Sequence, residues 1–412
     1  RHSLELPSLA AAFGHAHAAA GLLNVAVGAH CLHERMFITA GADGSLQPAE
    51  PWLAAAPRTV RVQVDALGGQ SSTVILHAND AQEDGLTQRR KGAGSSVEKP
   101  SFLKKLGFWN SAIHVFSGGD VAALINALDR NEESNSGPTR LVIVAQGDAT
   151  FERQRNLARA ALARVVAQPP RTDASGSEPA APRPLPFAKG IYFSSAPMPG
   201  EVGFVFTPAA AAYQGMGREL LFALPELGDQ VIGKFPCLAY TQDWLATAPR
   251  PAASDPFQVL QGCALLSQLH ATLTQEWLAI KPAAVLGVSS GETNSMFATG
   301  AWHDMDAMFA EIDASGMYTR EIAGDYAAAR RAWADRNPGP IQWAGWRVLA
   351  PVAEVEAALQ GEEFAYLTMI NAPADCLVAG QADACRRVVE KIGLNRCVEN
   401  ANEIIAHHPA VK

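Results

Sequence analysis

The sequence predicts an α/β protein whose main body is a parallel sheet covered by helices. From Glu201 onward, short apolar strands alternate with glycine turns and amphipathic helices, which is typical of parallel sheets. The apolar run 284–286 ends in Gly-Val-Ser-Ser-Gly, and a helix-like segment follows it. Residues 112–166 repeat the same alternation on a smaller scale. A length of 412 residues leaves room for about two to three domains.

The bulk composition narrows the classes of function. The net charge of −8 argues against a nucleic-acid partner. No stretch reaches the roughly 18–20 apolar residues that a membrane span needs, and the N-terminus lacks the basic-then-apolar pattern of a secretory signal. The six cysteines include no C-x-x-C pair, so we expect no disulfide framework, no metal site and a cytoplasmic location. Because the chain begins without Met, we expect a fragment of something longer.

The N-terminal 80 residues predict a helix and a hairpin. Small residues over 10–27 favour the helix, and two strand-like runs, 61–65 and 72–77, flank Gly68-Gly69. The next region predicts a small α/β unit, with strands at 113–116 and 141–145 and helices at 120–128 and 150–166. Residues 167–190 are rich in proline, which indicates a linker or mobile loop.

The second half predicts the main body and a small inserted lobe. Strands are expected at 202–207 and 285–286, with helices from Gly217 to Leu224 and over 257–280. Within 346–398 the pattern is strand, helix, two strands, helix, strand, and this βαββαβ order is that of the ferredoxin-like split unit. The expected elements are 347–350, 352–359, 364–370, 376–379, 382–392 and 396–398.

Ser289 is the leading candidate for a nucleophile. The glycines on either side of it allow a tight strand-to-helix turn, which exposes the hydroxyl at a helix N-terminus. A serine in that place can carry an acyl group if a histidine reaches it as a base. His407 and His408 are available near the end of the chain.

These motifs together resemble the acyltransferase domain of fatty acid and polyketide synthases. That family has Gly-His-Ser-x-Gly-Glu at its nucleophile turn, where this chain has Gly287-Val288-Ser289-Ser290-Gly291-Glu292. The family's ferredoxin-like insert often has an Asn-x-Pro turn, which Asn371-Ala372-Pro373 matches. A catalytic histidine with proline two places on follows the insert, as do His407 and Pro409 here, and the separation of 407 − 289 = 118 residues is of the family's usual size.

The first segment resembles the end of a ketosynthase or of its inactive relative, the chain length factor. Gly14-His15-Ala16-His17-Ala18-Ala19-Ala20-Gly21 matches a helix start of that family, which makes His15 a remnant of a ketosynthase motif, and Gly68-Gly69 matches its terminal hairpin. The sequences of residues 190–207 and 316–321 most resemble those of synthases of the polyunsaturated-fatty-acid type.

The resemblance implies an order of domains. A truncated thiolase-like tail (1–80) would precede an α/β ketosynthase–acyltransferase linker (81–195) that contains the proline-rich 167–190. An α/β-hydrolase-like acyltransferase core (196–412), truncated at its C-terminus, would follow, with a ferredoxin-like insert at 346–400.

The resemblance also implies a reaction. Ser289 would attack an acyl-CoA with His407 as the base, and the backbone N–H groups of Ser290 and Ala209 would form the oxyanion hole. The acyl group would then pass to the phosphopantetheine thiol of an acyl carrier protein, with no bound cofactor, and the other domains of the synthase would be partners. Gln261 resembles the glutamine that lines this site.

Several positions depart from the family pattern. Val288 stands in the substrate pocket where most members have histidine, and Ala209 stands where glutamine is usual. The arginine that clamps a malonyl carboxylate would fall at 314–315, which is Ala-Ser; the nearest basic residue is Arg320, a second candidate for the pocket. Without a bidentate guanidinium, a neutral acyl group fits at least as well as malonyl.

Two other functions remain open on the sequence. The departures also fit a catalytically degenerate scaffold or docking module of such a synthase. A serine esterase of the α/β-hydrolase kind is the third alternative, but that fold places an acidic residue between serine and histidine and several strands before the nucleophile. The βαββαβ insert argues against the esterase.

Overall fold

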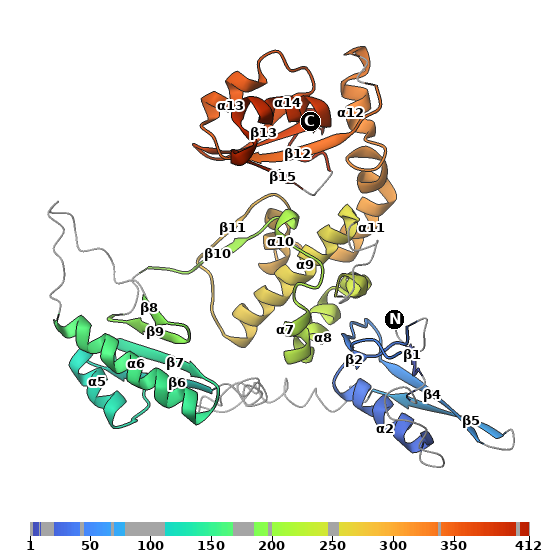
Figure 1. The fold of residues 1–412 in the computed structure, drawn as a ribbon. Helices are drawn as coiled ribbons and strands as arrows, with labels where there is room; N and C mark the ends of the chain where they lie inside the picture. Colours follow the sequence, from blue (N-terminus) through green and yellow to red (C-terminus); the bar gives the residue numbers. More distant parts are fainter. Residues whose placement is uncertain are drawn as a thin grey trace. The chain divides into compact units, whose positions relative to one another are not determined.

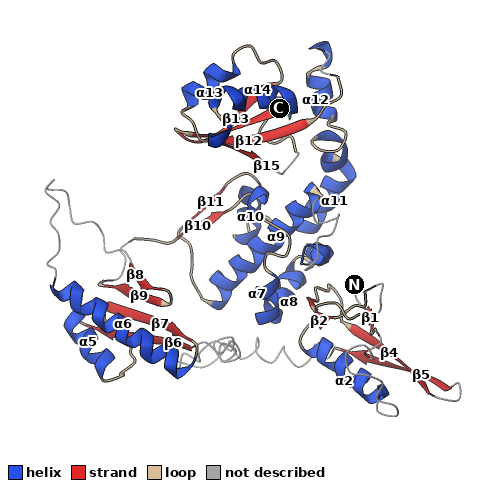
Figure 2. Cartoon of the chain, in the orientation of Figure 1, coloured by secondary structure: helices blue, strands red, loops and turns tan. Residues whose placement is uncertain are grey.

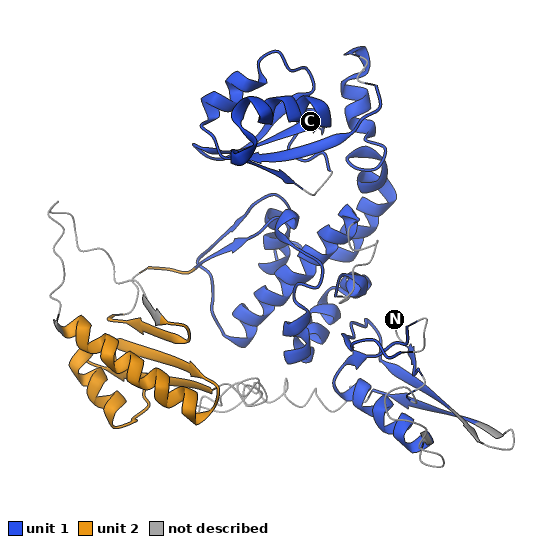
Figure 3. Ribbon diagram, viewed as in Figure 1, with its two compact units in different colours: residues 1–88, 203–412 blue, residues 89–202 orange. Residues whose placement is uncertain are grey.

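A computed structural model gives the fold of the chain. It describes residues 3–7, 9, 20–41, 45–66, 70–78, 112–167, 185–196, 200–245, 255–336, 339–400 and 404–411. The chain divides into two compact units, residues 1–88 with 203–412 and residues 89–202, which Figure 3 colours blue and orange. Figure 1 labels the helices and strands along the chain.

The N-terminal part of the first unit is a helix packed on a small sheet. Its elements are β1 (Ser3–Glu5), α2 (Ala20–His33), β2 (Met36–Phe37), β3 (Glu50–Pro51), β4 (Thr59–Ala66) and β5 (Gln70–His77). The predicted hairpin is confirmed, because β4 and β5 pair antiparallel, while β1 lies parallel to β4. The helix runs beyond its predicted end at Val27 to His33. Gly28 lies inside the helix, where its missing side chain lets α2 approach β4. A Cβ at this position would lie 3.0 Å from Val60.

This N-terminal part is tied to the main body by buried polar contacts. The main-chain N–H of Leu53 donates to the Gln242 side chain (2.9 Å), whose amide donates in turn to the carbonyl of Pro51 (2.7 Å). The guanidinium groups of Arg35 and Arg58 both bind the carboxylate of Asp229. Segments nearly 200 residues apart are therefore joined by satisfied polar groups, as burial requires.

The main body combines helices with a short parallel sheet. Its elements are β10 (Gly203–Phe206), η5 (Ala209–Ala211), α7 (Arg218–Ala223), α8 (Pro225–Lys234), η6 (Pro236–Leu245), α9 (Pro256–Thr272), the π-helical turn η8 (Leu273–Trp277), β11 (Ala284–Gly287), α10 (Ser290–Ala298), α11 (Met305–Ser315), the π-helical turn η9 (Met317–Glu321), α12 (Ala327–Ala332) and η10 (Ala334–Arg336). Figure 2 shows how far helices dominate this part of the chain. Strands β10 and β11 pair in parallel, as predicted.

The parallel sheet is less covered than the sequence predicts. Val205 on β10 is 67% exposed and Leu286 on β11 is 62% exposed, although α10 packs against both strands. Within the described residues, one side of this strand pair therefore faces open space. The apolar composition indicated a strand correctly, but it also predicted a helical cover that the described residues do not supply.

The small lobe is an antiparallel sheet with helices on one face. Its elements are β12 (Trp343–Val348), α13 (Val352–Leu359), β13 (Ala365–Ala372), β14 (Asp375–Gln381), α14 (Ala382–Ile392), η11 (Leu394–Arg396) and β15 (Cys397–Asn400), and η12 (Pro409–Val411) follows. The βαββαβ succession has the predicted order, and the strands lie in the order β13-β14-β12-β15. Figure 2 shows α13 and α14 on the same face of this sheet, where Val348, Val355, Val378 and Val388 form part of the core.

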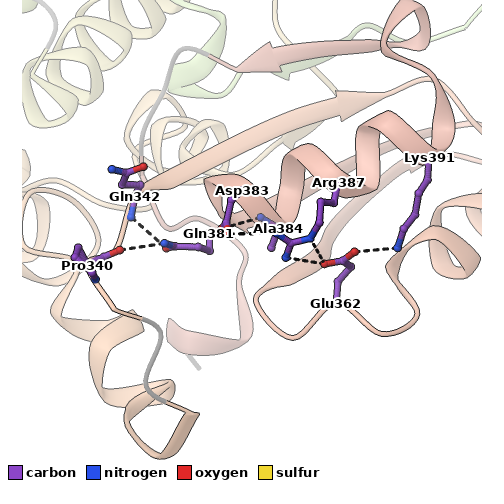
Figure 4. Close-up of polar contacts among 8 residues, drawn as sticks. All are labelled: Pro340, Gln342, Glu362, Gln381, Asp383, Ala384, Arg387 and Lys391. Atoms are coloured by element: carbon purple, nitrogen blue, oxygen red, sulfur yellow. Dashed lines mark hydrogen bonds and ion pairs between the residues drawn. The ribbon is translucent and has the colours of Figure 1, made fainter.

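Ionic contacts tie α14 to the rest of the small lobe (Figure 4). The Glu362 carboxylate accepts from Lys391 (2.9 Å) and from Arg387 (2.9 Å). On the other side, the Gln381 side chain accepts from the main-chain N–H of Gln342 (3.1 Å) and donates to the carbonyl of Pro340 (3.0 Å). Lys391, and after it Arg387, holds the pKa of the Glu362 carboxyl below its usual value, against the opposing effect of burial.

The lowered pKa of Glu362 predicts a pH-dependent loss of stability. The unfolded state takes up the proton first as pH falls, so the stabilisation is complete above the unfolded value of about 4.3 and is lost as pH falls through the folded pKa. Glu362→Gln should lower the free energy of unfolding at pH 7, and the difference from the parent should shrink by pH 3. Urea unfolding at the two pH values measures this. Glu363→Gln, next to it but exposed, is the control; an equal effect of both changes would contradict the assignment.

The described residues of the second unit form a four-stranded sheet with two helices. Its elements are β6 (Ala112–Gly118), α5 (Val121–Asp129), β7 (Thr139–Ala145), α6 (Gly147–Ala167), β8 (Leu185–Ala188) and β9 (Ile191–Ser194), with the strand order β6-β7-β9-β8. The predicted linker 167–190 therefore ends in a strand, which corrects that interpretation for 185–188. Pro186 is compatible with β8 because the strand lies at the sheet edge, where a missing N–H removes no ladder bond on the open side.

Candidate active site

Ser289 occupies a strained turn between β11 and α10. Its backbone has φ 55° and ψ −125°, and the helix begins at the next residue. The turn is held from both sides, because the N–H of Val288 donates to the carbonyl of Phe206 on β10 (3.1 Å) and the N–H of Glu292 to the carbonyl of Ser289 (2.9 Å). A positive φ at a non-glycine residue is uncommon, and such residues cluster at functional sites. Ser289 is also exposed, so its hydroxyl is accessible to a substrate.

The flanking glycines are required by close backbone contacts. A Cβ on Gly287 would lie 2.2 Å from the main-chain nitrogen of Glu292, and a Cβ on Gly291 would lie 2.2 Å from the carbonyl oxygen of Phe206. Neither neighbour is a flexible side chain, so a substitution must move the backbone. The two glycines bring the start of α10 against the end of β10, and this fixes the direction of the turn that carries Ser289.

Gly291→Ala should therefore displace the turn. We expect labelling of Ser289 by a fluorophosphonate to slow at least about tenfold, because a shift on the order of 1 Å at a reacting group is enough for a large loss. Gly233→Ala is the matched control: it lies in α8, where an added Cβ meets nothing within 4 Å, and alanine favours a helix by up to about 1 kcal/mol over glycine. Equal labelling rates in the two variants would contradict the steric account.

The two predicted oxyanion residues lie side by side. The N–H of Ala209 donates to the hydroxyl oxygen of Ser290 at 2.8 Å. This N–H is therefore occupied in the structure, and it becomes available to an oxyanion only when the Ser290 hydroxyl turns away. The main-chain N–H of Ser290 lies at the first position of α10, where the positive end of the helix dipole favours a negative charge.

Behind the turn lies a buried polar network that is not predicted from the sequence. The Asn294 side chain contacts the thiol of Cys263 (3.7 Å), and the Gln268 side chain donates to the carbonyl of Asn294 (3.1 Å). Burial raises the pKa of Cys263, although hydrogen bonds from Ser267, Ser290 and Asn294 act in the opposite direction. The available signal was Gln268, a polar residue in a helical stretch that is largely apolar from Cys263 to Leu269.

A cavity of about 420 Å³ lies next to this network, between β10 and α9. Its wall includes Phe204, Thr207, Cys263 and His270, but neither Ser289 nor His407 lines it. The cavity is therefore not the predicted acyl site itself. Burial lowers the pKa of His270, so that its ring stays neutral over a wider pH range.

The three predicted pocket residues differ in accessibility. Gln261 is 5% exposed and its side-chain oxygen accepts from Gln258 (3.1 Å). Val288 is 42% exposed beside the nucleophile turn. The Arg320 guanidinium donates to the carbonyl of Ser315 (3.1 Å) at the end of α11, so in the structure it is engaged locally.

The two C-terminal histidines have opposite environments. His407 is exposed and has φ 53°, again a positive value. His408 is 1% exposed, and burial lowers its pKa to about 4. Exposure makes His407 the better candidate for a base, as the sequence predicts. Among the described residues, the Ser289 hydroxyl and the His407 ring are not hydrogen-bonded to each other. His15 lies outside the described residues.

Comparisons with known proteins give partial matches. The chain matches no protein-family model. It is 28% identical over 134 residues to a polyunsaturated fatty acid synthase of Thraustochytrium sp., an alignment that covers 31% of this chain and 6% of the relative. It is 27% identical over 274 residues to the conidial yellow pigment biosynthesis polyketide synthase melA of Penicillium expansum, which covers 63% of this chain and 11% of the relative. The chain thus spans a small part of the curated relatives it matches.

Among solved structures, the acyltransferase domain of SpnD in complex with 2-(pent-4-yn-1-yl)malonyl aligns with a TM-score of 0.48 at 17% identity, over 73% of this chain and 67% of that one. The acyltransferase domain from module 8 of the salinomycin polyketide synthase aligns with a TM-score of 0.47 at 18% identity, over 73% and 68%. None of the described helices combines the length and apolar character needed to cross a bilayer.

The alignments with curated relatives show that the chain, over part of its length, is similar to polyketide and polyunsaturated fatty acid synthases.

Proposed function

We propose that this chain is the acyltransferase segment of a polyketide or polyunsaturated fatty acid synthase. It moves an acyl group from acyl-CoA to Ser289 and from there to the phosphopantetheine thiol of an acyl carrier protein. The observation that carries the proposal is the turn at Ser289, where a positive φ at a serine is held between a parallel strand pair and a helix N-terminus. The partial similarity to synthases of this kind supports it.

The reaction proceeds in two acyl transfers. His407 takes the proton of the Ser289 hydroxyl, which attacks the thioester carbonyl, and the tetrahedral intermediate expels CoA, whose sulfur takes that proton from His407. The thiol of the carrier protein then attacks the acyl-serine, with His407 again accepting the proton, and Ser289 regains its hydrogen as it leaves. The N–H groups of Ser290 and Ala209 stabilise the oxyanion in both steps, and such a donor contributes roughly 3 kcal/mol.

The exposed imidazole and the exposed hydroxyl must come together for this chemistry. Catalytic hydrogen bonds are often long in unliganded enzymes and tighten in the complex with substrate. The Ser290 hydroxyl must also release the N–H of Ala209, which it binds at 2.8 Å. The first change is an approach of the segment that carries His407, and the second is a rotation of the Ser290 side chain.

The domain assignments complete the proposal. The βαββαβ lobe is the ferredoxin-like insert, with the strand order that this topology requires. The first 80 residues are the tail of a ketosynthase or chain length factor, His15 is a remnant of its motif, and the second unit is the linker that follows it. The carboxylate clamp is absent at 314–315, and Arg320 is bonded to Ser315. A neutral acyl group is therefore a substrate class as suitable as malonyl.

Incubation with a panel of acyl-CoAs and a phosphopantetheinylated carrier protein tests the function. Intact-mass measurement should detect the acyl group first on the chain and then on the carrier protein, in amounts that exceed free acid. Rapid release of free acid without a thiol acceptor would instead identify an esterase. If no acyl-CoA, malonyl or neutral, acylates the chain, the transferase proposal is wrong and the chain is a docking module.

A further inference from the structure

His408 is enclosed by three aromatic rings from three different elements. The rings belong to Trp333 after α12, Trp343 on β12 and Tyr366 on β13, and their centroids lie 5.9, 4.9 and 4.4 Å from that of the imidazole. The rings of Trp343 and Tyr366 are within 15° and 5° of parallel to that of Trp333. The imidazole stands at 76–78° to all three. Such edge-to-face contacts are favourable for aromatic groups.

The hydrogen bond of His408 identifies which nitrogen carries the proton. Nδ1 accepts from the main-chain N–H of Ala410 at 3.0 Å, so the hydrogen of the neutral ring resides on Nε2. Nε2 is buried and has no hydrogen-bond partner among the described residues, which is consistent with a weak N–H contact to an aromatic face. Burial keeps the ring neutral by lowering its pKa to about 4, so Nδ1 remains an acceptor near neutral pH.

Two buried residues, Ile405 and His408, flank His407 in the sequence and hold its segment in place. On one side, Ile405 is 1% exposed and its N–H donates to the carbonyl of Ile322 (2.8 Å). On the other side, His408 lies among the three aromatic rings described above, which we call the aromatic box, and its bond to Ala410 closes the turn. His407 lies between them with φ 53° and an exposed side chain. A left-handed conformation at a residue with a side chain persists only when its surroundings hold it there.

We propose that His408 is a positioning residue: its buried ring and its bond to Ala410 hold the backbone of His407 in the left-handed conformation that keeps the His407 imidazole exposed and available as the base. The inference rests on the proposed function, because it assigns a role through the base of that reaction. It explains why two adjacent histidines differ so completely in exposure. The His408 ring makes two separate contributions. Its carbon atoms pack against the three aromatic rings, and its Nδ1 accepts the hydrogen bond that closes the turn at Ala410.

The two contributions can be separated by substitution. His408→Phe keeps an aromatic ring in the box but removes the acceptor for Ala410. His408→Asn keeps an acceptor at the position of Nδ1 but leaves part of the box empty. We expect the melting temperature to rank Phe above Asn. The rate of Ser289 acylation, measured per folded molecule by intact mass, should rank in the opposite order, with Phe at least about tenfold below the parent and Asn closer to it.

The crossed ranking distinguishes positioning from mere stabilisation. If activity and melting temperature fall in the same order, His408 only stabilises the fold and the proposal is overturned. Hydrogen exchange of residues 404–411 in the full chain gives a readout that needs no activity: the Ala410 amide should exchange faster in the Phe variant than in the Asn variant. Should the parent fail to acylate while this exchange pattern holds, the proposed function fails but the anchoring of the turn stands. Equal exchange in the two variants overturns the anchoring itself.

Discussion

Ser289→Ala is expected to abolish acylation of the chain. The variant keeps the turn but removes the oxygen that attacks the thioester, and loss of a nucleophile in a serine enzyme lowers turnover by a factor on the order of 10⁴ or more. Intact mass after incubation with acyl-CoA should show the parent shifted by one acyl group and the variant unshifted. The same contrast is expected for labelling by a fluorophosphonate, which reacts with activated serines.

Ser295→Ala is the matched control for that change. Ser295 lies on α10, the helix that follows Ser289, and its hydroxyl donates to the carbonyl of Glu292 (2.7 Å), so it is close in sequence but has a structural partner. This variant should acylate at a rate within about threefold of the parent. The lost hydrogen bond contributes roughly 1 kcal/mol to the stability of the fold, and the attacking oxygen of Ser289 is still present. An acyl group retained in Ser289→Ala would show that another residue is the nucleophile.

Asp229→Ala is expected to have the largest effect on stability. Asp229 is the shared carboxylate of Arg35 and Arg58, whose side chains are only 12% and 5% exposed. Removal of the carboxylate takes the shared anion from two largely buried guanidinium groups, although Arg35 keeps a contact with Glu226 (3.8 Å), and breaking such a network typically destabilises a protein by about 3–5 kcal/mol. Arg58 keeps its bonds to the carbonyl of Trp52 (3.0 and 2.8 Å), so we expect a value near the lower end of that range.

Urea unfolding followed by tryptophan fluorescence measures this loss, because Trp52 and Trp244 are buried in the two parts that the network joins. Glu390→Ala is the control in the same unit. Glu390 pairs with Arg386 at 3.0 Å, but the two side chains are 50% and 70% exposed, so its loss should be about 0.5 kcal/mol or less. Equal losses in the two variants would mean that Arg35 and Arg58 do not bind Asp229 in solution.

Local pattern was sufficient for much of the fold. The hairpin β4–β5 and the order of elements in the small lobe follow from alternating apolar residues and turn chemistry, which are encoded within a few residues. The predicted end of α2 was wrong because Gly28 is tolerated inside the helix by contact with Val60, a residue outside any local window. Strand β8 was missed because proline composition indicates a linker, whereas an edge position makes Pro186 acceptable in a sheet.

The sequence indicated the turn at Ser289 but not the contacts around it. The glycine pattern indicated the turn at Ser289, and the steric reason for both glycines agrees with that pattern. The bond between Ala209 and the Ser290 hydroxyl could not be foreseen, because it depends on how residues about 80 positions apart pack. The aromatic box around His408 likewise joins three elements that only the tertiary fold brings together.

A crystal structure of the fluorophosphonate adduct would show whether Ser289 and His407 act together. We expect the phosphonyl group to be attached to Ser289, one of its oxygens to accept from the main-chain N–H of Ser290, and a ring nitrogen of His407 to lie within about 3.2 Å of the Ser289 oxygen. An adduct on another residue, or a His407 ring that stays beyond reach of Ser289 in the labelled protein, would contradict the proposed reaction.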